Sequence, residues 1–120
     1  PDSRDARKRR AVERVKEAVS SAPAEAWDVA TLARIAHMSP FHFCRVFKHV
    51  TGRSVGTYIL HERLSVALYP ILEGENLITV ALDSGFASHS HFTQAFCRRF
   101  GTPPSAVRRR QPSTKPQGDG

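Results

Sequence analysis

The sequence predicts an all-α protein in which a long helix joins two helix-turn-helix subdomains. Apolar residues recur at helical spacing in about seven segments, which residues that cap or break helices separate. The most distinctive segment, residues 77–104, reads as a short helix, a glycine turn and a second helix. An earlier segment repeats its pattern, since three residues have counterparts 49 positions later: Phe43, Phe47 and Gly52 match Phe92, Phe96 and Gly101.

The composition of the chain, and above all its charge, limits the kinds of function that it can have. The 120 residues contain 18 Lys and Arg against 11 Asp and Glu, a formal net charge of +7. This charge indicates an anionic partner, with nucleic acid the first choice and a membrane surface the second. No apolar run reaches the length of a membrane span, and no signal peptide opens the chain. Cys44 and Cys97 stand alone without a CxxC pattern, which suggests a reducing, cytoplasmic location without a disulfide framework.

The first copy begins with a helix over residues 4–20, whose buried stripe comprises Ala11, Val12, Val15 and Val19. Four cations crowd its first turns, at positions 7–10. Cations are unfavourable at a helix N-terminus, so two interpretations stay open: a solvated face or a phosphate contact. Asp28 is the expected N-cap of the next helix, and Ser39 with Pro40 starts the one after it.

The second copy is reached through the predicted linker helix of residues 54–72. Pro70 should kink this helix or end it early, because proline removes a backbone hydrogen bond. Asn76 is expected to cap the next helix, Gly85 to adopt a left-handed backbone, and Ser88 to cap the last long helix. The resulting organisation is a first subdomain over 4–53, the linker over 54–72, a second subdomain over 73–109 and a disordered tail over 110–120.

These motifs resemble the DNA-binding domain of AraC/XylS-family bacterial transcription regulators. The similarity covers roughly residues 10–109 and includes Tyr58, Arg63, Gly85, Pro104 and Arg108. It implies seven helices and a rigid linker, with two helices entering successive major-groove segments of a promoter. Val55, Pro70 and Val107 depart from the family pattern, which leaves the local geometry there open.

A helical wheel assigns candidate DNA contacts in the first recognition helix. With the buried face at Phe43, Val46, Phe47 and Val50, the outer face is expected to carry Phe41, Cys44, Arg45 and Lys48. Arg45 has the chemistry for a bidentate contact with guanine, and Phe41 for a thymine methyl group. Cys44 is either a small apolar contact or inert.

The repeat assigns the corresponding contacts in the second helix. Ser90, Thr93 and Gln94 take the places of Phe41, Cys44 and Arg45. Gln94 can pair with adenine, while Ser90 and Thr93 can reach a base or a phosphate. His89 lies in the first turn, and at least one of Arg98 and Arg99 is expected on the DNA backbone. The two helices should lie on one face of the protein about 34 Å apart.

Three functions compete. The first is sequence-specific regulation of transcription; the second is DNA targeting in a DNA-repair methyltransferase-type protein, which needs a reactive cysteine. The third is charge-driven binding without sequence preference. No catalytic motif is visible, no cofactor is implied, and the His89 and His91 side chains point apart, which disfavours a metal site. The resemblance adds double-stranded promoter DNA and RNA polymerase as partners, and any effector is expected on a domain outside this chain. The family includes activators, but the sequence leaves open whether the chain acts as an activator or a repressor.

Overall fold

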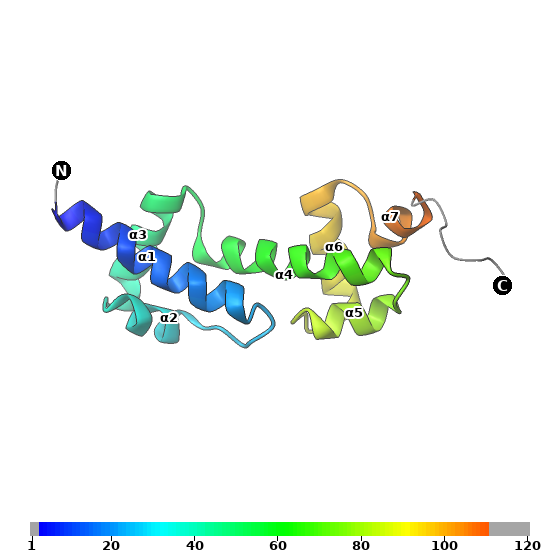
Figure 1. Ribbon diagram of the computed structural model, residues 1–120, viewed down its shortest axis with the longest axis horizontal. Coiled ribbons are helices and arrows are strands. Elements are labelled where there is room, and N and C mark those ends of the chain that lie inside the picture. Colours follow the sequence, from blue (N-terminus) through cyan, green and yellow to red (C-terminus); the bar gives the residue numbers. More distant parts are fainter. Residues whose placement is uncertain (1–2, 111–120) are drawn as a thin grey trace. The chain divides into compact units, whose positions relative to one another are not determined.

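The structure, a computed structural model, describes residues 3–110, which form seven helices and no strand (Figure 1). The helices are α1 (Ser3–Ser21), α2 (Val29–Ala36), α3 (Pro40–Thr51), α4 (Val55–Leu72), α5 (Leu77–Asp83), α6 (His89–Phe100) and α7 (Pro104–Arg110). The predicted all-α class is confirmed. None of these helices is both long enough and apolar enough to cross a bilayer.

The chain divides into two compact units, with the division after Arg63, inside α4. The first half of α4 therefore belongs to the first unit and the second half to the second unit. Each unit consists of a leading helix, a short helix, a recognition helix and a trailing helix. In this arrangement α4 trails the first unit and leads the second.

The first unit is held by an apolar core between α1, α2, α3 and the start of α4. The predicted stripe of α1 is fully buried, and Leu32, Ala33, Phe43 and Phe47 join it with at most 1% of their surface exposed. Burying each large side chain stabilises the unit by about 1.5–3 kcal/mol. Val55, one of the departures from the family pattern, is buried in this core as the first residue of α4.

The second unit repeats this packing with its own residues. Phe92 and Phe96 of α6 are buried as Phe43 and Phe47 are in α3. The ring centroids lie 5.7 Å apart in the second pair and 5.8 Å apart in the first. The remaining fully or nearly fully buried residues of this unit are Leu64, Ala67, Ile71, Val80, Ala81, Ser84, Phe86, Ala95 and Pro104.

The predicted helix caps are confirmed. Asp28, Ser39, Asn76 and Ser88 each accept a hydrogen bond from a backbone N–H in the first turn of the following helix. These bonds satisfy donors that have no partner inside the helix.

The turns inside the two helix-turn-helix motifs are equivalent. The N–H of Met38 donates to Ala33 at 2.9 Å, and that of Phe86 donates to Ala81 at 3.0 Å. Gly85 adopts the predicted left-handed backbone, with φ of 99°, and His37 takes the same place in the first turn with φ of 60°. The sequence gives no sign of this role for His37, because histidine rarely adopts that conformation.

In each unit, an arginine of the trailing helix donates hydrogen bonds to the segment that precedes the helix-turn-helix motif. In the first unit, Arg63 donates from Nε to the carbonyl of Pro23 at 2.8 Å and from its guanidinium to Glu25 at 2.7 Å. In the second unit, Arg108 donates to the carbonyls of Ile71 and Glu75. Burial lowers the pKa of the Arg63 guanidinium, because the charged form loses hydration there.

Of the two outcomes predicted at Pro70, a kink or an early end of the helix, the early end is wrong. The helix α4 continues through Pro70 to Leu72, so the proline lies in its last turn. The missing N–H of Pro70 would have bonded one turn back, and the remaining backbone bonds suffice to carry the helix two residues further. At the other end of the chain α7 reaches Arg110, so the predicted disordered tail falls, from residue 111 onward, outside the described residues.

Candidate nucleic-acid interface

The outer face of α3 carries all four of the residues predicted to contact DNA from the first unit. Phe41, Cys44, Arg45 and Lys48 are all exposed. At about 100° per residue, they share an arc of roughly 100°, opposite the buried Phe43 and Phe47. The Ser39 cap, which accepts from the N–H of His42 at 3.2 Å, fixes where the helix begins.

Phe41 and Arg45 form a stacked pair on this face. Phe41 is 73% exposed, whereas the other phenylalanines of α3 are fully buried. The guanidinium carbon of Arg45 lies 5.6 Å from the centre of the Phe41 ring, within range of a cation–π contact. This contact orients a planar set of donors on the outer face of α3, which suits recognition of a guanine edge or a phosphate.

The outer face of α6 is chemically different. His89, Ser90 and Gln94 are exposed, and Thr93 is half-buried. Apart from the imidazole of His89, these side chains are two small hydroxyl groups and the amide of Gln94, without the arginine and lysine of the α3 face. Since Ser88 caps α6 as Ser39 caps α3, with a distance of 3.0 Å to the N–H of His91, the first turns of the two helices correspond.

The two arginines near the end of α6 point in different directions. Arg98 lies four residues after Gln94 and so extends the same side of the helix. The guanidinium carbon of Arg99 lies 5.2 Å from the centre of the Phe100 ring, next to the side of α6 that faces the core. Of the two, Arg98 is the better placed to accompany Gln94.

Three further residues, which the sequence prediction did not include, lie on or beside these faces. Cys97 is half-buried and takes the place of Lys48, at the centre of the outer arc of α6. His42 and His49 are exposed along one flank of α3, beside Arg45. The 49-residue offset could have identified Cys97, whereas only packing shows that α1 lies beside the two histidines.

The described residues offer little for chemistry beyond binding. Among residues 3–110, no group of three His, Cys, Asp or Glu side chains is close enough together to hold a metal ion. His91 lies against the Phe86 ring, with 5.3 Å between the ring centroids, rather than beside Cys97. The candidate site is thus a pair of exposed helix faces.

The fold and these faces define the class of protein: a tandem helix-turn-helix protein with one exposed recognition helix in each unit. A protein-family model described as a helix-turn-helix domain matches residues 32–110. The chain belongs to this family, in its AraC-type form.

Curated relatives agree with this assignment. The chain is 38% identical over 90 residues to the RCS-specific HTH-type transcriptional activator RclR of Escherichia coli K12, an alignment covering 73% of this chain and 31% of that protein. It is 37% identical over 79 residues to the right origin-binding protein of the same organism, covering 65% of this chain and 27% of that protein. The chain therefore spans less than a third of the length of these relatives.

Solved structures share the fold. The DNA-binding domain of AdpA, a global transcriptional factor solved in complex with a target DNA, superposes with a TM-score of 0.76 and 28% identity, over 82% of this chain and 89% of that one. An AraC-type transcriptional regulator from Chromobacterium violaceum gives a TM-score of 0.78 over 88% of this chain and 96% of that one. Its identity is 22%, so this second likeness concerns the fold alone.

Proposed function

We propose that this chain is the DNA-reading part of an AraC-type transcription regulator, which places α3 and α6 in successive major-groove segments of a promoter. The observation that carries the proposal is the equivalence of the two helices. Each begins at a serine cap, buries a phenylalanine pair and presents its opposite face to solvent. A helix of this kind fits the major groove, which is about 12 Å wide.

The two faces should read different bases. Arg45, stacked on Phe41, presents paired donors that suit guanine, and Gln94 presents a donor and an acceptor that suit adenine. Cys44, Ser90 and Thr93 add small contacts. We assign phosphate contacts to Lys48 and Arg98, which lie further along their helices than Arg45 and Gln94, and a base or phosphate contact to His89. Arg99 is the weakest candidate because its guanidinium lies over the Phe100 ring. The bound site should therefore be asymmetric, and a single chain should bind it in one orientation.

The DNA-repair alternative receives no support. The similar proteins described above are named as regulators or as an origin-binding protein, and none of those names describes a methyltransferase. We infer that the chain works in the cytoplasm without catalysis. RNA polymerase and an effector-binding domain outside this chain are proposed partners, because the relatives are more than three times longer than the matched segment.

Selection of bound duplexes from a random DNA pool tests the proposal. The expected result is a two-part motif with unlike halves, whose centres lie about 10 base pairs apart. Charge-driven binding, the remaining rival, predicts that no motif is enriched and that affinity follows salt concentration alone. A selection that returned random sequences would contradict sequence-specific reading.

A further inference from the structure

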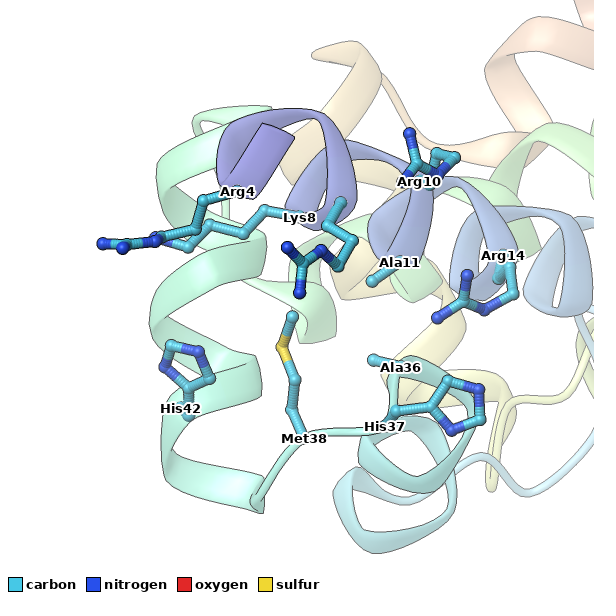
Figure 2. A pocket seen from close by; sticks show the side chains of 10 residues that line it. Arg4, Lys8, Arg10, Ala11, Arg14, Ala36, His37, Met38 and His42 are labelled. Atoms are coloured by element: carbon cyan, nitrogen blue, oxygen red, sulfur yellow. The ribbon is translucent and has the colours of Figure 1, made fainter. Parts of the chain in front are cut away.

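The N-terminal half of α1 forms one wall of a strongly basic hollow in the first unit. The hollow has a volume of about 680 Å³. Its charged lining comes entirely from α1 and consists of Arg4, Arg7, Lys8, Arg10 and Arg14. His37 and His42 line it from the α2–α3 turn and from α3, and no carboxylate contributes to the lining. Figure 2 shows Arg4 and Lys8 extending from α1 toward the side of His42.

These five cations lie close to one another along α1. Four of them, Arg4, Arg7, Lys8 and Arg10, fall within the first eight residues of the helix, so like charges repel one another across neighbouring turns. The Nε of Arg14 donates to the carbonyl of Ile35 at 3.2 Å. Five like charges around one hollow without an acidic residue favour binding of an anion, since neutralisation would relieve their repulsion.

A second hollow, beside the recognition helix α3, shares two lining residues with the first. Lys8 and His42 line this second hollow, of about 490 Å³, together with Arg45, Val46 and His49. A third hollow joins Lys8 to Arg9, His49 and Asp5. Lys8 thus lies along the flank of α3 that carries both histidines, next to the arginine proposed to read a base.

The fit of a helix in the groove identifies the anion. An α-helix with its side chains is about 10–12 Å across and the major groove about 12 Å wide, so the sugar–phosphate walls must lie against the flanks of α3. One of those flanks is the one beside α1. A phosphate on that wall would come within reach of the long side chains of Lys8 and Arg7.

We propose that the α1 hollow is a phosphodiester-binding site, in which Lys8, Arg7 and His42 hold the backbone of the DNA strand beside the first recognition helix. The proposal rests on the proposed function, because it places α3 in the groove. It adds a contact from a helix that enters no groove and reads no base.

A matched pair of lysine substitutions on α1 tests it. Lys8 and Lys16 are both half-buried on the same helix, but Lys16 pairs with Glu13 at 3.3 Å and lies in a different hollow. Affinity of the full chain is measured for Lys8→Gln and Lys16→Gln on a selected duplex and on a random duplex across a salt series. Lys8→Gln should lower the slope of log affinity against log salt by about 0.9 on both duplexes, as loss of one phosphate contact requires. Lys16→Gln should leave the slope unchanged.

Two further measurements distinguish loss of the phosphate site from loss of folding and from failure of the proposed function. The melting temperature of Lys8→Gln should not fall, since the substitution removes one of several like charges on neighbouring turns of α1. The preference of each variant for the selected over the random duplex should equal that of the wild type. If the wild type lacked any preference, the proposed function would fail irrespective of the slopes. If the preference were intact and the slope of Lys8→Gln equalled that of Lys16→Gln, the phosphate site would be wrong.

Ethylation of single phosphates provides the direct assignment. The wild type should lose affinity when the phosphates flanking the bases read by α3 are ethylated, and Lys8→Gln should lose less at the same positions. Equal sensitivity of both proteins at every phosphate would overturn the proposal.

Discussion

At the scale of single residues, the exposed faces of α3 and α6 carry few chemical groups, and each group has a proposed role in binding DNA. Phe41 is the most exposed of the large apolar residues described, and its ring lies against Arg45. The exposed Phe41 ring does not stabilise the core. Its cation–π contact instead orients the guanidinium of Arg45. Recognition by Arg45 should therefore depend on Phe41.

Phe41→Ala should weaken discrimination at the base read by Arg45 as well as at any thymine that Phe41 itself touches. The free energy of unfolding should stay within about 0.5 kcal/mol of the wild-type value, because the ring is exposed. A double-mutant cycle of Phe41→Ala with Arg45→Ala, scored by binding to single-base variants, measures the coupling. Phe41→Tyr, which keeps the ring, is the control. Additive losses would show that the two side chains act independently.

At the scale of helices and loops, caps and arginine clamps determine how the recognition helices are presented. The trailing helix of each unit bonds through one arginine to carbonyls that precede the helix-turn-helix motif. These are Pro23 and Glu25 of the loop in the first unit, and Ile71 at the end of α4 and Glu75 of the loop in the second. The carbonyls of Glu25 and Ile71 also accept from the backbone N–H groups of Trp27 and Gly74, so the arginines add charged donors to an already bonded turn and fix its position against the trailing helix. Arg63 and Arg108 should therefore contribute both to the stability of their units and to the orientation of the recognition helices.

Arg63→Ala should lower the stability of the first unit by about 1–3 kcal/mol, since it leaves the carbonyls of Pro23 and Glu25 without their charged donor. Arg63→Lys should recover only part of this loss, because an ammonium group cannot reproduce the paired geometry of a guanidinium. Denaturant unfolding monitored at Trp27, which lies in the same unit, measures both variants. Full recovery by lysine would mean that charge alone matters at this position.

The Asp28 cap should make α2 sensitive to acid. Its backbone hydrogen bond from Thr31 holds the pKa of the carboxyl below its usual value of 3.8, because the bond favours the ionised form. The stabilisation is therefore complete above that value and is lost as the pH falls below it. Asp28→Asn keeps a capping oxygen and should lack this acid dependence in thermal melts between pH 2 and 5. An identical pH profile for the two proteins would show that the cap does not titrate as described.

The sequence predicts the elements well and the contacts between them poorly. Helical periodicity and local capping chemistry suffice for the seven helices, the buried phenylalanines and all four caps. The left-handed His37, the arginine clamps and the position of α1 beside α3 depend on packing between distant segments, which no local pattern encodes. The early end predicted at Pro70 does not occur, because a proline breaks a helix interior far more strongly than its last turn.

At the scale of the whole molecule, the repeated architecture implies a bipartite interaction with DNA. Each unit has its own core and its own recognition helix, so each can engage one groove segment. Their outer faces differ, with an arginine in one and a glutamine in the other. Binding should accordingly combine two distinct half-sites.

Chemical footprinting of a selected duplex should show two protected base patches about 10 base pairs apart on one face of the DNA, because α3 and α6 would enter successive turns of the same groove. Gln94→Ala should reduce protection in one patch and leave the other intact. A single patch of half the expected extent would mean that only one unit engages the DNA.

Base reading by the equivalent faces of α3 and α6 can be separated from phosphate contact by comparing substitutions at residues proposed for each role. Binding of Arg45→Ala, Gln94→Ala, Lys48→Ala and Arg98→Ala is measured on a matched site, on single-base variants and on random DNA across a salt series. The first two variants should each lose about 1–3 kcal/mol of discrimination at one base position. The other two should weaken all sequences alike and lower the salt slope by about one. Intact base preferences in both Arg45→Ala and Gln94→Ala would contradict reading by these faces.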